Sequence, residues 1–213
     1  MTRLVIVRHG NTFEADEPPR RIGSRTDLPL TAAGEEQAKA LARHFEANGV
    51  RFDRVLTSAL QRARRTAELI VAEQAIPVET ASFLTEIDHG PDEGQLEADV
   101  IARLGNDAIT LWDTEWIAPE GWEVGAQWRV PAWREFVERA AEELPYGTIL
   151  LVTSNGAARF ALAALGLKIG DNRASAKFRT GSYGLVEVGA VADFHLVGWN
   201  ARPGETPGDK GLL

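Results

Sequence analysis

The chain has 213 residues, of which 44% are hydrophobic and 25% charged, and a formal net charge of −8. This length suits one large α/β domain or two small ones. The basic residues are scattered, whereas nucleic-acid-binding proteins carry a basic patch, so we expect no nucleic-acid partner. No apolar run approaches the roughly 18 residues of a membrane span, and we expect no membrane partner. The chain has no cysteine, which excludes disulfides and thiol chemistry.

The amino terminus enters an apolar run at Leu4, so we expect no signal peptide. Together with the lack of cysteine, this predicts a cytoplasmic protein. No feature of the sequence assigns an oligomeric state.

Strands and helices are expected to alternate along most of the chain. The expected strands are Leu4–Val7, Phe52–Thr57, Ile76–Thr80, Thr148–Thr153, Tyr183–Val188 and Phe194–Trp199. Helices are expected from Thr31 to near Gly49, from Ser58 to about Glu73, in part of Glu97–Trp116, and over Ala157–Leu165. Ser58 and Gln61 fit a capping box, in which the serine side chain caps the second helix. The alternation is typical of an α/β fold with a mostly parallel central sheet flanked by helices.

We expect one α/β domain over residues 1–200 and a mobile tail, rich in glycine and proline, over residues 201–213. Residues 88–133 interrupt the alternation and are interpreted as an inserted lid subdomain over one end of the sheet. This segment contains five of the six tryptophans. Large aromatic side chains either pack a small subdomain or line a substrate entrance, and the sequence leaves both interpretations open. Gly121 and Gly125 suit loops that move as a lid.

Polar side chains stand at three strand ends, which are Arg8-His9-Gly10, Thr57-Ser58 followed by Arg62, and Ser154-Asn155-Gly156. Ligands of open α/β sheets bind at the carboxyl ends of the strands, so these segments are expected to meet. Arg62 falls in the first turn of its helix, near the unpaired N–H groups of the helix start, which is a natural phosphate position. The sequence therefore predicts an anion site that contains a histidine.

Four stretches, in this order, resemble the motifs of the histidine phosphatase superfamily. They are Leu4–Thr12 (LVIVRHGNT), Gly23–Gly34 (GSRTDLPLTAAG), Thr57–Ala67 (TSALQRARRTA) and Leu84–Gly94 (LTEIDHGPDEG). The resemblance extends over most of the chain and implies a phosphoglycerate-mutase-like α/β fold.

The resemblance implies that His9 is the nucleophile and forms a phosphohistidine, which water then hydrolyses. Imidazole suits this step because it is largely neutral near pH 7, and the charge of Arg8 would oppose its protonation. Arg8 and Arg62 would bind the non-bridging phosphate oxygens and stabilise their charge. Glu86 matches the proton donor to the leaving oxygen. No metal and no other cofactor is implied, because the arginines supply the positive charge.

The same motifs assign Asn11 and Gly23 to phosphate or substrate binding. The chain departs from the family pattern at Asn155, which stands where the family has a second histidine. An asparagine amide still donates a hydrogen bond to a phosphate oxygen, but it carries no charge and exchanges no proton. His89 is a candidate for compensating this loss.

The predicted function is metal-independent hydrolysis of a phosphomonoester, with a small phosphorylated metabolite as the substrate class. Asn155 keeps an alternative open, a pseudoenzyme that binds a phosphorylated ligand with weak or no turnover. A bisphosphoglycerate-dependent mutase is disfavoured, because Ala15 stands where mutase-like members often have an asparagine and the phosphate cradle is thinner.

Overall fold

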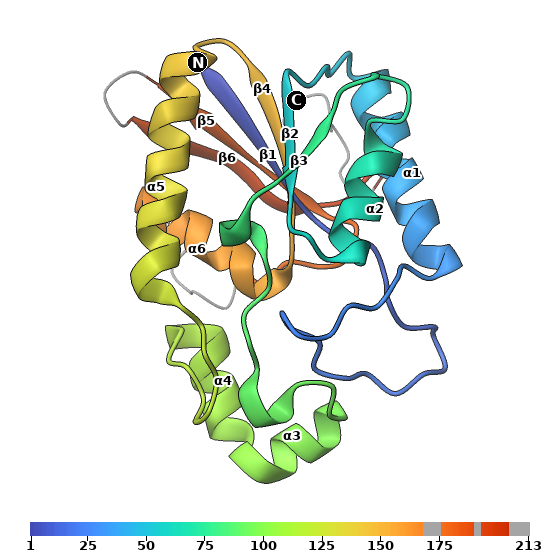
Figure 1. Ribbon diagram of the computed structural model, residues 1–213, viewed down its shortest axis with the longest axis vertical. Helices are drawn as coiled ribbons and strands as arrows, with labels where there is room; N and C mark the ends of the chain where they lie inside the picture. The colour runs from blue at the N-terminus through green and yellow to red at the C-terminus, as the bar shows by residue number, and fades with distance from the viewer. Residues whose placement is uncertain (168–175, 190–192, 205–213) are drawn as a thin grey trace.

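The apolar run near the amino terminus forms an inner strand of a six-stranded sheet (Figure 1). The protein is described by a computed structural model, which covers residues 1–167, 176–189 and 193–204. The strands are β1 (Thr2–Arg8), β2 (Arg54–Thr57), β3 (Val78–Thr80), β4 (Thr148–Thr153), β5 (Tyr183–Val188) and β6 (Phe194–Ala201). Their order is β3-β2-β4-β1-β5-β6, with β1 to β4 parallel and β5 and β6 antiparallel to their neighbours. The predicted α/β fold with a mostly parallel sheet is confirmed.

Helices cover both faces of this sheet (Figure 1). They are α1 (Ala32–Ala47) and α2 (Gln61–Ile70) on one face, and α5 (Ala126–Glu143) and α6 (Asn155–Leu165) on the other. Side chains of β1 alternate between the two sides. Val5 and Val7 belong to the core under α1 and α2, whereas Leu4 and Ile6 belong to the core under α5 and α6. Burial on both faces explains why this strand is a continuous apolar run.

The two helices that follow β1 and β2 begin in different ways. Helix α1 has Thr31 as its N-cap, and the threonine hydroxyl accepts the N–H of Gly34 at 3.1 Å, as is usual for this residue type. Helix α2 begins later than the capping box predicts, and Ser58 does not cap it. Instead, the Gln61 N–H donates to the carboxylate of Asp27 at 2.7 Å. The capping-box prediction is wrong because a distant loop supplies the acceptor.

Residues 88–133 are the segment interpreted as an insertion. The middle part of this segment lies beyond the carboxyl ends of the parallel strands (Figure 1). After the short turn η1 (Ser82–Leu84), it contains η2 (Gly90–Asp92), α3 (Glu97–Leu104), α4 (Asn106–Glu115) and the start of α5. Trp112 and Trp122 are buried and contact each other edge to face, and Trp133 is fully buried in the core. These three side chains are part of the packed interior, whereas Trp128 is 43% exposed.

Most of the tail predicted over residues 201–213 lies outside the described residues, which end at residue 204. No helix within the described ranges is long and apolar enough to cross a membrane.

Candidate active site

The carboxyl ends of β1, β2 and β4 lie next to one another, because Arg8 is in register with Thr153 and Thr57 with Val152. The three polar strand ends therefore meet, as predicted. His9 follows β1, is 3% exposed, and donates its backbone N–H to the carbonyl oxygen of Thr153 at 3.0 Å. The end of β4 thus fixes the backbone of the candidate nucleophile.

Both ring nitrogens of His9 have a defined partner. Nδ1 lies 2.8 Å from the carbonyl oxygen of Gly10, so Nδ1 carries the hydrogen and donates it. Nε2 then holds a lone pair, and the Nε–H of Arg62 donates to it at 3.3 Å. Burial, followed by the charges of Arg62 and Arg8, lowers the pKa of His9 well below its ordinary value of 6.5. The imidazole is therefore neutral at pH 7.

Arg62 is fully buried in the first turn of α2, and backbone carbonyls hold its guanidinium. Nη1 donates to the carbonyl oxygen of Thr26 at 2.6 Å, and Nη2 donates to that of Gly23 at 3.0 Å. Burial lowers the pKa of Arg62, while nearby carboxylates oppose this change. A guanidinium has five N–H groups, and the contacts to His9, Thr26 and Gly23 use three of them. The other two suit an oxyanion.

Arg8 supplies the second guanidinium of the site. Its Nη1 donates to the carbonyl oxygen of Phe178, and its buried Nε has no hydrogen-bond partner among the described residues. Burial lowers the pKa of Arg8 to about 10, with an opposing effect from Glu86 and a further lowering by Arg62. Arg8 is therefore still charged at pH 7. Two cations beside a neutral imidazole favour a phosphate group at this position.

Glu86 is 6% exposed and lies against the start of α6. Its carboxylate accepts the backbone N–H groups of Gly156 at 3.1 Å and Ala157 at 3.0 Å, and also the N–H of Ile87 at 2.9 Å. The first N–H groups of a helix have no partner within the helix, so at the start of α6 they bind this carboxyl group instead. A Cβ on Gly156 would lie 2.4 Å from Oε1 of Glu86, so this close approach requires glycine.

Asn155 is the first residue of α6, and its side chain is oriented by Phe178. Its Oδ1 accepts the backbone N–H of Phe178 at 2.7 Å, so its NH₂ group is left as the donor on the other side of the amide. The carbonyl of the same Phe178 binds Arg8. The backbone of one residue therefore connects Arg8 with Asn155.

Asn11 lies two residues after His9, but its described hydrogen bonds go elsewhere. Its Oδ1 accepts the hydroxyl of Thr180 at 2.5 Å, and its N–H donates to Gln37 at 2.9 Å. Gly23, by contrast, contacts Arg62 directly through its carbonyl. The structure therefore joins Gly23 to the arginine and leaves Asn11 at the margin of the site.

Arg129 was not singled out from the sequence, although it supports the segment that carries Glu86. It is buried on α5 and donates to the carbonyl oxygens of Glu86 at 3.1 Å, Phe83 at 3.3 Å and Thr85. The sequence did indicate a buried position for this arginine, since Arg129 stands four residues before Trp133 and thus on the apolar face of its helix.

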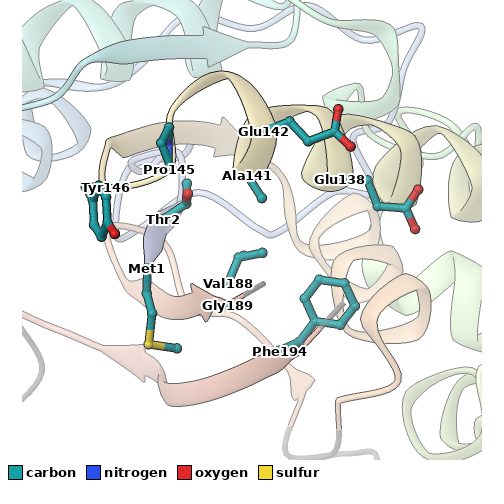
Figure 2. A pocket seen from close by; sticks show the side chains of 10 residues that line it. All are labelled: Met1, Thr2, Glu138, Ala141, Glu142, Pro145, Tyr146, Val188, Gly189 and Phe194. Atoms are coloured by element: carbon teal, nitrogen blue, oxygen red, sulfur yellow. The ribbon is translucent and has the colours of Figure 1, made fainter. Parts of the chain in front are cut away.

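A cavity of about 740 Å³ lies at the opposite end of β1 from His9 (Figure 2). Met1 and Thr2 line it, together with apolar side chains such as Phe194 and two carboxylates, Glu138 and Glu142. Its described lining contains no arginine, lysine or histidine. The two carboxylates repel a phosphate, so this cavity suits an anion less well than the strand ends, where two buried arginines lie.

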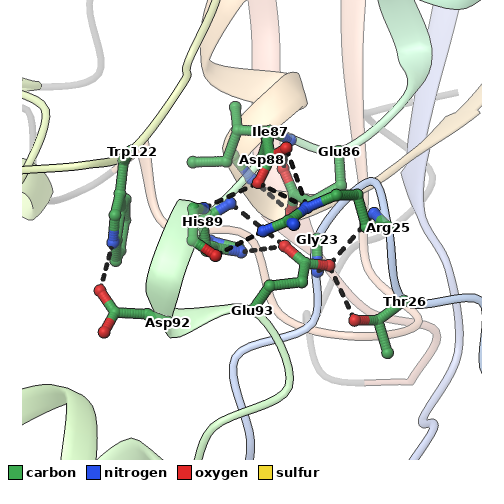
Figure 3. Close-up of polar contacts among 12 residues, drawn as sticks. Gly23, Arg25, Thr26, Glu86, Ile87, Asp88, His89, Asp92, Glu93 and Trp122 are labelled. Carbon is green, nitrogen blue, oxygen red and sulfur yellow. Dashed lines mark hydrogen bonds and ion pairs between the residues drawn. The ribbon is translucent and has the colours of Figure 1, made fainter.

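His89, the candidate for compensating the missing histidine, is buried, and its ring lies between Trp122 and Glu93 (Figure 3). Its ring packs edge to face against Trp122, with centroids 4.5 Å apart, and its Nδ1 lies 3.6 Å from the carboxylate of Glu93. Neither contact joins it to His9 or Arg62. The described geometry therefore gives no support for compensation.

Comparison with known proteins gives matches over most of the chain. The family model of the histidine phosphatase superfamily (branch 1) matches residues 4–201. A 2,3-bisphosphoglycerate-dependent phosphoglycerate mutase of Methylobacterium sp. (strain 4-46) is 34% identical over 146 residues, 67% of this chain and 64% of the mutase. The chain thus spans slightly less than two thirds of that mutase. The adenosylcobalamin/alpha-ribazole phosphatase of Escherichia coli (strain K12) is 33% identical over 168 residues, 76% of this chain and 78% of that phosphatase.

Solved structures share the fold over nearly the whole chain. The mycobacterial glucosyl-3-phosphoglycerate phosphatase superposes with a TM-score of 0.77 at 25% identity, covering 93% of this chain and 98% of that one. The alpha-ribazole phosphatase from Shigella flexneri gives a TM-score of 0.72 at 27% identity, covering 94% and 96%. The similar proteins are thus phosphatases and mutases.

Proposed function

The chain belongs to the histidine phosphatase superfamily, and on this ground we propose that it is a metal-independent phosphomonoester hydrolase acting through a phosphohistidine on His9. One observation carries the proposal. Nδ1 of His9 donates to Gly10, while Nε2, with its lone pair, faces Arg62. A neutral imidazole in this orientation directs its nucleophilic atom to the place where two arginines would hold a phosphate.

In the proposed reaction, the Nε–H of Arg62 turns from Nε2 of His9 to a phosphate oxygen, the freed lone pair of Nε2 attacks phosphorus, and the bond between phosphorus and the leaving oxygen breaks. Arg8 and Arg62 stabilise the charge on the non-bridging oxygens, which is the main requirement of phosphoryl transfer. Glu86 gives a proton to the leaving oxygen and then takes one from the water that cleaves the phosphorus–nitrogen bond. The NH₂ group of Asn155 donates to a phosphate oxygen, because Phe178 holds the amide in that orientation.

A small phosphorylated metabolite is the proposed substrate class. The names of two similar phosphatases, for alpha-ribazole and for glucosyl-3-phosphoglycerate, support it. Ala15, at a position where mutase-like members often have asparagine, favours hydrolysis over transfer between hydroxyls.

Hydrolysis of p-nitrophenyl phosphate tests the proposal. We expect His9→Ala to lower kcat/KM by a factor on the order of 10³ or more, because the nucleophile is lost. Arg64→Ala is the control, since Arg64 lies on α2 near Arg62 but its side chain is 60% exposed. Equal activity of wild type and His9→Ala would eliminate the nucleophile assignment.

Asn155 favours a second candidate, a phosphate-binding pseudoenzyme, because an amide replaces an imidazole that carries charge. The variant Asn155→His separates the two. A large gain in turnover would indicate that the natural protein is impaired and serves as a binder. A loss of turnover would indicate an enzyme whose site is adapted to asparagine.

A further inference from the structure

The carboxylate of Glu93 is the centre of a hydrogen-bond cluster beside the site (Figure 3). Its side chain is only 8% exposed. Oε1 accepts the backbone N–H groups of Gly23 at 2.8 Å and Arg25 at 3.2 Å, and the hydroxyl of Thr26 at 2.8 Å. Oε2 accepts the backbone N–H of His89 at 3.1 Å. One carboxylate thus joins two segments that are far apart in the sequence.

The loop that Glu93 binds is also the loop that holds Arg62. Gly23 and Thr26 bind Glu93 through an N–H and an O–H, and both bind the guanidinium of Arg62 through their carbonyl oxygens. Arg62 in turn donates to Nε2 of His9. A continuous chain of hydrogen bonds therefore leads from Glu93 to the candidate nucleophile.

We propose that Glu93 is a positioning residue, which fixes the Gly23–Thr26 loop and thereby aims the guanidinium of Arg62 at His9 and at the phosphate. The inference rests on the proposed roles of His9 and Arg62. An arginine side chain has many rotamers, and it orients an oxyanion well only when its fork is fixed in advance. The carbonyl oxygens of Gly23 and Thr26 fix the guanidinium of Arg62, and the carboxylate of Glu93 fixes the loop that carries these two carbonyls.

The packing around Gly23 leaves this loop little freedom. A Cβ at Gly23 would lie 2.4 Å from Oε2 of Glu93 and 2.4 Å from the carbonyl oxygen of Ile87, so only glycine fits between them. Burial alone would raise the pKa of Glu93, but the nearby imidazole of His89, the hydroxyl of Thr26 and the backbone N–H groups lower it to about 2. The carboxylate is therefore charged whenever the protein is active near neutral pH, and its charge also favours the charged form of Arg62.

Two variants weaken this connection to different degrees. Glu93→Gln keeps the shape of the side chain but removes the charge and one acceptor, and we expect kcat/KM for p-nitrophenyl phosphate to fall about 10- to 100-fold. Thr26→Val removes only one of the hydrogen bonds, and we expect a fall of about 3- to 10-fold. Glu79→Gln is the control, because that carboxylate pairs with Arg54 on the surface at 2.7 Å.

The pKa of His9 gives a readout that a purely structural role of Glu93 would not change. It is measured by NMR titration of the imidazole C–H signals without substrate, with His9→Ala to assign the signal. The charge of Arg62 lowers this pKa, so a displaced Arg62 lets it rise. We expect the pKa of His9 to rise in Glu93→Gln, to rise less in Thr26→Val, and to stay constant in Glu79→Gln.

An unchanged pKa of His9 together with an unchanged kcat/KM in folded Glu93→Gln would overturn the positioning role. Should Glu93→Gln fail to fold by circular dichroism, Thr26→Val decides by the same two measurements. Failure of the proposed function has a different signature, since a wild type without phosphatase activity still reports the pKa of His9. In that case the titration alone decides whether Glu93 positions Arg62.

Discussion

The arginines at the site differ from three arginines in and around residues 88–133 in whether a carboxylate pairs with them. Arg8, Arg62 and Arg129 donate to backbone carbonyls and take part in none of the described ion pairs. Arg21 pairs with Glu97, Arg103 with Asp92 and Arg159 with Asp113, and the last two arginines also donate to the backbone carbonyls of Glu120 and Trp112. The difference lies in the partner, since both groups contain buried side chains.

This contrast shows how a protein keeps a charge available for a ligand. A carbonyl dipole satisfies an N–H group without cancelling the positive charge, whereas a carboxylate cancels it. Glu86 is a comparable case, because uncharged backbone N–H groups orient its carboxyl group. The site groups are thus oriented by neutral partners, as preorganised electrostatic catalysis requires.

Among the variants that test this comparison, Arg62→Lys has the largest expected effect. An ammonium cannot reach Thr26, Gly23 and a phosphate at once, so we expect kcat/KM to fall about 10²- to 10³-fold. Arg103→Lys, the same substitution in a carboxylate-bound arginine, is expected to retain most of the activity. Steady-state kinetics on an aryl phosphate measures both, and equal losses would contradict the distinction between the two groups of arginines.

Gly156→Ala tests whether the start of α6 orients the carboxyl group of Glu86. The added methyl group would lie 2.4 Å from Oε1 of Glu86 and displace the carboxylate. We expect kcat/KM to fall about 10- to 100-fold on an alkyl phosphate, whose leaving oxygen needs a proton. The loss on p-nitrophenyl phosphate should be smaller, because its leaving group needs little protonation. Losses of the same size on both substrates would refute the proton-donor role of Glu86.

Arg103→Gln should affect stability rather than catalysis. It leaves Asp92, whose side chain is 2% exposed, with the indole N–H of Trp122 but without its cation. We expect the free energy of unfolding in urea to fall by about 1–3 kcal/mol. Arg54→Gln removes an exposed pair with Glu79 and should cost about 1 kcal/mol or less. A similarly small loss of unfolding free energy in both variants would show that the burial of Asp92 does not increase the cost of removing its arginine partner.

The pH dependence is expected to be the mildest effect. Since the pKa of folded His9 lies well below 6.5, the imidazole stays neutral and kcat/KM should persist as the pH falls through 6.5. The unfolded chain takes up a proton there and the folded one does not, so stability is highest above 6.5 and falls as the pH decreases below it. Urea unfolding of wild type and His9→Gln from pH 5 to 8 isolates this contribution. A difference that is constant over the range would contradict the low pKa.

Much of the fold could be predicted because local patterns record burial. The runs Thr148–Thr153 and Tyr183–Val188 were predicted with the bounds that β4 and β5 have, since strands buried on both faces are mostly apolar. Four motifs in order predicted the family. The start of α2 was predicted wrongly, because its cap comes from Asp27, 34 residues before Gln61.

The sequence by itself determined which side chains stand at the strand ends, because hydrophobic runs and the residues that end them are local features. It also carried a missed signal, Arg129 on the apolar face of α5. Only the tertiary structure decided the partner of each charged group. Glu93 and Gly23 are 70 residues apart and Arg8 and Phe178 are 170 apart, so packing, not local pattern, brings them together. Whether an arginine meets a carbonyl or a carboxylate depends on that packing, and this choice determines which charges are left for a ligand.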